Sequence, residues 1–163
     1  MKYFHFNGEI NEKSLDDFLQ FINENEVGEL VIVLNSIGGK KNLTHVLLDI
    51  INLNSNRITL ISCGCYSASF LLFYKAKCKK KMTEGCVGMM HYSSTNINTM
   101  SNGQPTYSED ENIIKNWKER VKDEVEFVEK FMTPLEIKKY KKGNDVYFTF
   151  KRMKEIFPDV EII

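Results

Sequence analysis

The sequence predicts an α/β fold in which helices alternate with the strands of a mostly parallel sheet. Segments whose apolar residues recur every three or four positions, as in amphipathic helices, alternate with short runs of consecutive apolar residues, as in strands buried on both faces. Glycine and serine follow these runs, where turns are expected. A length of 163 residues fits one domain, and no repeat or linker divides residues 1–163.

The first part of the chain alternates strictly between strands and helices. Its apolar run from Leu30 to Leu34 is typical of a buried parallel strand. The predicted elements are, in order, an edge strand over residues 2–8, a helix over 11–25, a strand over 29–36 that ends at Gly38 and Gly39, a helix over 42–53 and a strand over 57–64.

The second part continues this order and adds one long helix. An apolar stripe runs from Ile113 to Phe131 among charged residues, and a helix of this length needs a surface to cover, for which we expect a neighbouring subunit. The predicted elements are a buried helix over 69–76, a solvated lysine-rich turn over 75–81, a strand over 86–92, a loop or irregular hairpin over 95–106, the long helix over 109–132, a short helix over 134–142 that Thr133 and Pro134 begin, and a strand, a helix and a tail over 145–163.

Composition and the pattern of apolar residues exclude some classes of function and location. The 22 basic residues equal the 22 acidic ones, so neither nucleic acid nor an anionic membrane is an expected partner. The longest apolar runs are about half the roughly 20 residues of a membrane span, and the first residues lack a signal pattern, so a cytoplasmic protein is expected. The spacing of Cys63, Cys65, Cys78 and Cys86 does not match a zinc site, and we expect reduced, mostly buried thiols with no metal and no cofactor.

Three residues at predicted element ends form a candidate catalytic triad. A serine hydroxyl needs a base to take its proton, and the base works best when a carboxylate orients it. Ser67 follows a strand, His91 ends the next strand, and Asp145 lies in a turn 54 residues later. Each also has an ordinary structural interpretation, as a hydrogen-bonded histidine or a capping aspartate. The order Ser, His, Asp and the absence of a G-x-S-x-G motif disfavour the chymotrypsin, subtilisin and α/β-hydrolase arrangements.

Other serines are weaker candidates for the nucleophile. Ser69 is the rival of Ser67, but if a helix begins near Ser67 the hydroxyl of Ser69 is turned away from the crevice. Ser36 and Ser62 lie in or beside strands and are expected to be structural. Tyr66 and the run from Phe70 to Phe73 are expected to pack in the core.

Four motifs, taken together and in order, resemble the Clp protease proteolytic subunit and its relatives in the ClpP/crotonase superfamily. They are VLNSIGG (33–39), CGCYSASFLLF (63–73), VGMMHYS (87–93) and DVYFT (145–149). The resemblance implies an α/β fold of repeated β-β-α and βαβ units with a protruding long handle helix, here a hairpin and helix over about 95–132. It also implies a Ser-His-Asp serine endopeptidase that acts on peptides or unfolded proteins inside a homo-oligomer of stacked rings.

Carried over residue by residue, the resemblance assigns a role to each site residue. It makes Ser67 the nucleophile, His91 the general base and Asp145 the residue that orients the imidazole. The backbone N–H groups of Gly39 and Ala68 would form the oxyanion hole, and substrate would lie beside Gly38, Tyr92 and Ser93.

The chain also departs from the family pattern. Ile37 stands where proline is usual, Cys63 stands where glycine is common, and Tyr92 and Ser93 replace Gln-Pro after the histidine. The printed chain begins at its first strand, so we expect no axial loops, and an unfoldase ATPase partner is left open. Two alternatives remain. One is a non-catalytic or processing-assembly subunit on the same fold. The other is an acyl-CoA enzyme of the crotonase type, which is disfavoured because that chemistry usually places acids beside the acyl pocket, where the predicted segments offer Ser67 and His91 instead.

Overall fold

The computed structural model describes residues 1–92, 100–101, 104–105, 122 and 124–163. The chain divides into two compact units, Met1–Met89 with Tyr147–Ile163, and Met90–Val146. The first unit contains β1 (Lys2–Ile10), α1 (Glu12–Glu24), β2 (Leu30–Gly39), α2 (Lys41–Leu53), β3 (Ile58–Tyr66), α3 (Ala68–Lys75), most of β4 (Lys79–Met90), α6 (Phe150–Ile156) and β8 (Glu161–Ile162).

The strands of the first unit form a parallel sheet. Among the described residues the order is β1-β2-β3-β4-β7, where β7 is Val146–Phe148, and β8 also pairs with β4. The pairs β1–β2, β2–β3, β3–β4 and β4–β8 are parallel, and β1 is at the edge as predicted. A register shift between Ser62 and Gly64 marks a β-bulge at Cys63, which changes the face toward which the last residues of β3 point.

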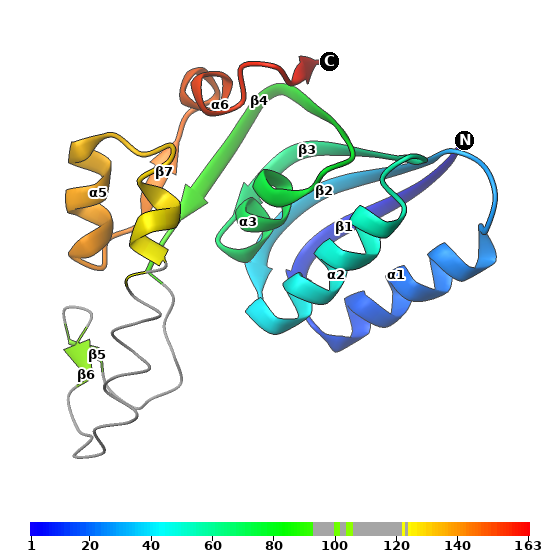
Figure 1. Ribbon diagram of the computed structural model, residues 1–163, viewed down its shortest axis with the longest axis horizontal. Coiled ribbons are helices and arrows are strands. Elements are labelled where there is room, and N and C mark those ends of the chain that lie inside the picture. Colours follow the sequence, from blue (N-terminus) through cyan, green and yellow to red (C-terminus); the bar gives the residue numbers. More distant parts are fainter. Residues whose placement is uncertain (93–99, 102–103, 106–121, 123) are drawn as a thin grey trace. The chain divides into compact units, whose positions relative to one another are not determined.

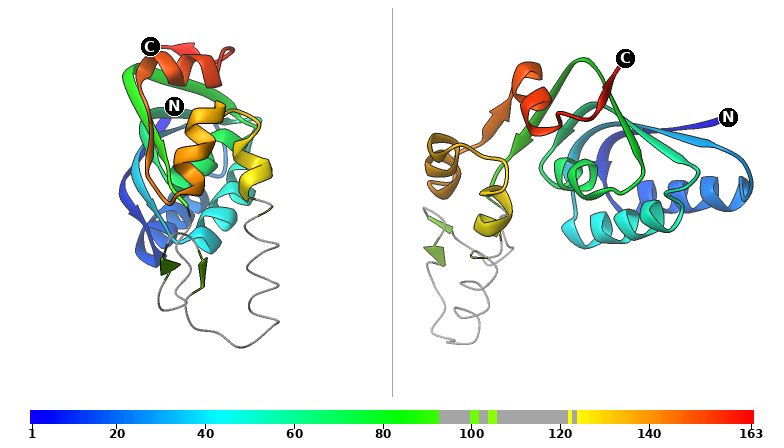
Figure 2. Two further views of the ribbon diagram at one scale, coloured as in Figure 1. Left: turned by 90° about the vertical axis from the view of Figure 1, so that its left-hand side faces the viewer. Right: turned by 45° about the horizontal axis from the view of Figure 1, so that its top comes forward.

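Helices α1, α2 and α3 lie along one face of this sheet (Figures 1 and 2). The start of α1 is fixed by a capping box, in which the Asn11 side chain accepts from the Ser14 N–H and the Ser14 hydroxyl accepts from the Asn11 N–H. Phe18 of α1 is fully buried against the rings of Phe4 and Phe6. The alternation of strands and helices predicted from the sequence is therefore confirmed for this unit.

Helix α3 is buried almost all round, as predicted for an apolar segment without a polar face. Phe70 packs on Phe148 and Phe157, with ring centroids 5.2 and 5.8 Å away. Phe73 meets Phe157 edge to face at 5.0 Å. These contacts attach the carboxyl-terminal segment to α3.

Two boundaries differ from the sequence prediction. Residues 79–81 are not part of a solvated turn but begin β4, with Lys79 to Lys81 opposite Thr59 to Ile61. Lysine is unusual in a strand, but Lys79 is exposed, and its aliphatic stem can follow the sheet while the ammonium group stays in water. The predicted tail contains β8, whose Glu161 and Ile162 pair with Lys81 and Met82.

The second unit contains the short strands β5 (Met100–Ser101) and β6 (Gln104–Pro105), a helical segment at 124–128, and α5 (Pro134–Lys141). The pairing of β5 with β6 is antiparallel, in the segment predicted as a loop or irregular hairpin. Thr133 and Glu136 form a capping box at the start of α5, as predicted. The predicted long helix lies largely outside the described residues, and its described part ends at Val128 rather than at Met132. The prediction of one domain over 1–163 stays a prediction.

No helix among the described residues has the length and apolar composition needed to cross a membrane.

Candidate active site

Ser67 lies at a sharp turn where β3 leads into α3 (Figure 1). Its backbone angles are φ 56° and ψ −121°, and it is the one residue other than glycine with positive φ in the described part of the chain. An L-residue in such a conformation costs about 1–3 kcal/mol, which the surrounding structure must supply. A strained serine between a strand and a helix is the arrangement that exposes a nucleophilic hydroxyl in hydrolases.

Hydrogen bonds on both sides hold this turn. The Ser67 N–H donates to the carbonyl of Met89 in β4 at 2.7 Å. The Ser67 carbonyl accepts from the N–H groups of Phe70 at 3.1 Å and Leu71 at 3.2 Å, which closes the first turn of α3. Ser67 is therefore fixed between the neighbouring strand and the helix, with its side chain not used as a cap.

Ser69 is a structural residue in this arrangement. Its side chain is fully buried, and its hydroxyl accepts from the Tyr66 N–H at 2.8 Å. The same oxygen lies 2.7 Å from the Ser36 carbonyl and 2.8 Å from the Tyr66 carbonyl, either of which can take its proton. Ser69 thus joins the start of α3 to β2 and to the end of β3, which agrees with the prediction that its hydroxyl is turned away from the site.

Gly38 packs against the Ser67 turn. Its φ is +92°, and a Cβ built on it would lie 2.6 Å from the Tyr66 carbonyl oxygen, 2.9 Å from the Ala68 nitrogen and 2.9 Å from Ser67 Cβ. Its own N–H donates to the hydroxyl of Ser36 at 3.1 Å, so this amide is already used. The sequence placed Gly38 beside substrate; the structure gives it a role the sequence analysis missed, the close approach of β2 to the first turn of α3.

Gly39 is the second glycine of the pair. A Cβ on it would collide with the backbone of Ile10 in β1, and its φ is +148°. The two glycines therefore let β2 lie between β1 and the Ser67 turn. The two expected oxyanion donors therefore lie on adjacent elements, Gly39 at the end of β2 and Ala68 at the start of α3. The amide nitrogen of Ala68 is the atom that lies 2.9 Å from a Cβ built on Gly38.

Buried polar side chains lie below the turn. Ser62 and Ser36 are both buried, and Ser36 donates to the Gly8 carbonyl at 2.6 Å, so the prediction that they are structural agrees with their contacts. The thiol of Cys86 donates to the Ser62 hydroxyl at 3.3 Å, and burial raises the pKa of the neighbouring Cys65 thiol. No cluster of three or more potential metal ligands is present in the part of the chain that the structure describes.

The cysteines are mostly buried, as predicted: Cys65, Cys78 and Cys86 are buried and Cys63 is partly exposed. None of the four forms a disulfide. Burial also raises the pKa of the Cys78 thiol, so its reactive thiolate form is disfavoured. Cys65 and Cys78 therefore act as buried packing groups.

The other predicted site residues belong to the second unit. His91 and Tyr92 directly follow β4, and Asp145 directly precedes β7. Tyr92 is half-buried, with its ring centroid 5.2 Å from that of Tyr140. Ser93 lies outside the described residues. The structure thus brings Ser67, Ala68, Gly38 and Gly39 together within the first unit, and the triad with His91 and Asp145 stays a prediction.

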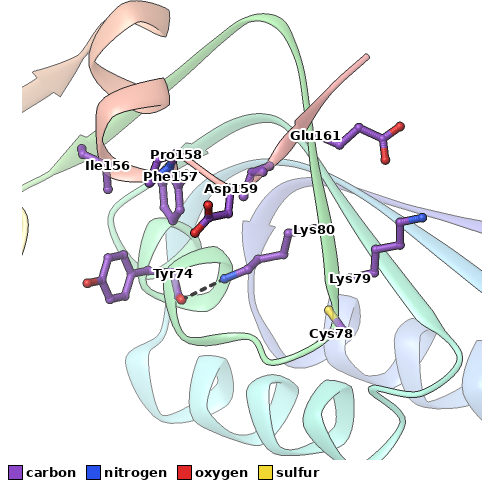
Figure 3. Close-up of a pocket in the computed structure, with 10 residues that line it drawn as sticks. Tyr74, Cys78, Lys79, Lys80, Ile156, Phe157, Pro158, Asp159 and Glu161 are labelled. Carbon is purple, nitrogen blue, oxygen red and sulfur yellow. Dashed lines mark hydrogen bonds between the residues drawn. The ribbon is translucent and has the colours of Figure 1, made fainter.

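A cavity of about 670 Å³ in the first unit is lined by none of these residues (Figure 3). It lies among the end of α3, the start of β4 and the segment after α6, and Lys80 projects into it. The Lys80 ammonium donates to the carbonyls of Phe73 at 3.4 Å and Tyr74 at 3.3 Å, and burial lowers its pKa. This lysine neutralises the negative end of the α3 dipole, which accounts for its position without a ligand.

The sheet order, the helices on one face and the serine turn define a ClpP-like α/β fold. Among solved structures, the crystal structure of the ClpP protease catalytic domain from Plasmodium falciparum is similar to this chain. The match has a TM-score of 0.62 and 24% sequence identity, and covers 99% of this chain and 84% of that chain. No protein-family model and no curated protein sequence matches the chain. The ClpP-like α/β fold that the four motifs predicted is therefore confirmed, and its long handle helix stays a prediction.

Proposed function

We propose that this protein is a serine endopeptidase of the Clp type, with Ser67 as nucleophile, His91 as general base and Asp145 as the group that orients the imidazole. The observation that carries the proposal is the strained backbone of Ser67, at φ 56° in the turn between β3 and α3. Because strain of this kind lowers stability, it is kept only where the surrounding contacts enforce it, and such positions cluster at functional sites.

The chemistry follows from the proposed roles. His91 takes the Ser67 proton as the hydroxyl oxygen attacks a peptide carbonyl, and then gives the proton to the leaving amine. The amide hydrogens of Gly39 and Ala68 stabilise the oxyanion, where the loss of one donor typically costs about 3–4 kcal/mol of transition-state stabilisation. Water then attacks the acyl-enzyme with His91 again as base, which releases the acid and restores Ser67.

Chain connectivity supports the choice of His91. Met89, whose carbonyl accepts the Ser67 N–H at 2.7 Å, is only two residues before His91. Two residues of extended chain span at most about 7 Å, so the backbone of His91 lies within about 7 Å of the backbone of Met89. Asp145 immediately precedes β7, and β7 neighbours β4 in the sheet. All three proposed residues are thus attached to adjacent strands.

The resemblance to the Clp family extends the proposal to substrate and assembly. An extended peptide or unfolded segment would lie beside Gly38, Tyr92 and Ser93, and a homo-oligomeric ring would form through the segment 95–132. Analytical ultracentrifugation of the full chain tests the assembly. We expect a mass of several subunits, and a monomer at micromolar concentration would contradict the ring.

Covalent labelling tests the catalytic proposal. We expect a fluorophosphonate or β-lactone probe to add once to the wild-type chain, and Ser67→Ala to abolish this labelling. Ser55→Ala is the matched control, because it removes a hydroxyl outside the Ser67 turn and should keep the label. Labelling that survives Ser67→Ala would exclude Ser67 as nucleophile. Absence of labelling and of peptide hydrolysis in an assembled wild-type protein would instead favour the non-catalytic subunit.

A further inference from the structure

A cluster of two tyrosines and one glutamate lies next to His91 in the second unit. Tyr92 directly follows His91, and its ring centroid is 5.2 Å from that of Tyr140 at an interplanar angle of 48°. The Tyr140 hydroxyl donates to Glu124 Oε2 at 3.3 Å. The three side chains come from the segment after β4, from the helical segment at 124–128 and from α5.

The cluster is a specific interaction and not a surface contact. Tyr140 is only 1% exposed, and a buried phenol needs a hydrogen-bond partner, which Glu124 provides. Burial and the charge of Glu124 raise the pKa of both Tyr140 and Tyr92, which keeps the Tyr140 phenol protonated as the donor to this carboxylate.

The two elements that support Tyr92 are themselves fixed. The capping box of Thr133 and Glu136 sets the start of α5. Lys141 near the end of α5 lies 3.8 Å from Glu129, which follows the helical segment. Val128 in that segment is fully buried. Tyr140 and Glu124 therefore form a platform whose two halves are joined by a hydrogen bond and an ion pair.

Residues 91 and 92 need such a platform because they lie in neither a helix nor a strand. On the amino-terminal side of His91 the chain is held by β4, where the Met89 carbonyl accepts the Ser67 N–H. On the other side, the ring of Tyr92 contacts the buried ring of Tyr140. The contact with Tyr140 therefore holds the backbone directly after His91.

We propose that Tyr140 and Glu124 are positioning residues for His91: they fix Tyr92, and Tyr92 fixes the backbone that carries the imidazole. The inference rests on the proposed function for its catalytic consequence, but the placement of His91 is measurable without any activity.

The test uses NMR of the full chain with ring-labelled histidine, in which only His5, His45 and His91 give signals. We expect Glu124→Ala and Tyr140→Phe to shift or broaden the His91 signal and to leave those of His5 and His45 unchanged. Glu124→Gln should restore the wild-type signal, because its amide oxygen can accept the same bond. The matched control is Glu126→Gln, which changes an exposed glutamate of the same segment.

Kinetics on the same variants adds the catalytic consequence. We expect kcat to fall 10- to 100-fold in Glu124→Ala with KM changed less than threefold, because misplacing a base by about 1 Å can cost 100-fold. A His91 signal that is unchanged in both Glu124→Ala and Tyr140→Phe would overturn the inference. If the wild type hydrolyses no peptide, the proposed function fails, and the NMR comparison still decides the role of the platform. If Tyr140→Phe does not fold, the Glu124→Ala and Glu124→Gln pair decides it.

Discussion

Replacing Gly38 by alanine probes the contact between β2 and the Ser67 turn. The new Cβ would lie 2.6 Å from the Tyr66 carbonyl oxygen and 2.9 Å from the Ala68 nitrogen, and both are backbone atoms that cannot rotate away. Forcing extra atoms into a packed site costs typically about 1–3 kcal/mol. The positive φ of +92° adds about 1–2 kcal/mol for any L-residue. We therefore expect Gly38→Ala to lower the free energy of unfolding by about 2–5 kcal/mol.

A matched control separates the two contributions. Gly28 has φ +94° and nothing within 4 Å of a built Cβ, so Gly28→Ala carries the same backbone cost without the collision. Urea unfolding should show Gly38→Ala less stable than Gly28→Ala by about 1–3 kcal/mol. Probe labelling of Ser67 should also be lost in Gly38→Ala alone, because Ala68 and Ser67 must move. Equal destabilisation by the two substitutions, with labelling kept in both, would refute the close approach.

Three further predictions concern stability. Ser67→Gly should be about 1–2 kcal/mol more stable than Ser67→Ala in urea unfolding, because glycine adopts φ 56° without strain. Thr133 is the control, since it is also an N-cap residue but has φ −71°. A difference in stability between the Ser67 variants that is smaller than the difference between Thr133→Gly and Thr133→Ala would contradict the strain. The pKa of Tyr140 is raised, so its contribution to stability is fully present below pH 10 and is lost above it, by up to about 1.4 kcal/mol per pH unit. The free energy of unfolding should therefore fall less steeply at alkaline pH in Tyr140→Phe than in the wild type. An identical slope in the two proteins would count against a buried phenol. Phe18→Ala should cost about 3–5 kcal/mol, whereas Leu53→Ala, at a side chain that is 84% exposed, should cost under 1 kcal/mol; comparable losses in thermal unfolding would show that Phe18 is not in the core.

Much of the first unit could be predicted from sequence because its periodicity is strong. The run from Leu30 to Leu34 has no polar break, which only a strand covered on both faces explains, and it lies in β2. The apolar segment from Ala68 has no polar face, and it is the buried helix α3. The turn at Ser67 followed from these two assignments, since a strand and a helix had to meet there.

The details that matter for chemistry carried no local signal. Nothing in the residues around Ser67 indicates its positive φ. The turn is held by a hydrogen bond from the Ser67 N–H to the carbonyl of Met89, which lies 22 positions later in the chain. The approach of Gly38 to Ala68 likewise joins two segments far apart in sequence. Lys79 to Lys81 were expected in a turn because of their charge, whereas strand pairing with β3 decided their conformation.

The role of Tyr140 was also hidden from sequence analysis. Its position in α5 indicates a buried face at most, and its partners Tyr92 and Glu124 are 48 and 16 residues away. Pairwise contacts of this kind are set by tertiary structure, which a single sequence does not encode in any local pattern.

A crystal structure of the protein after reaction with a fluorophosphonate tests the central claim most directly. The account predicts a covalent bond from Ser67 Oγ to phosphorus, with the phosphoryl oxygen within about 2.7–3.1 Å of the amide nitrogens of Gly39 and Ala68. An adduct on another residue, or a phosphoryl oxygen directed away from both amides, would contradict it.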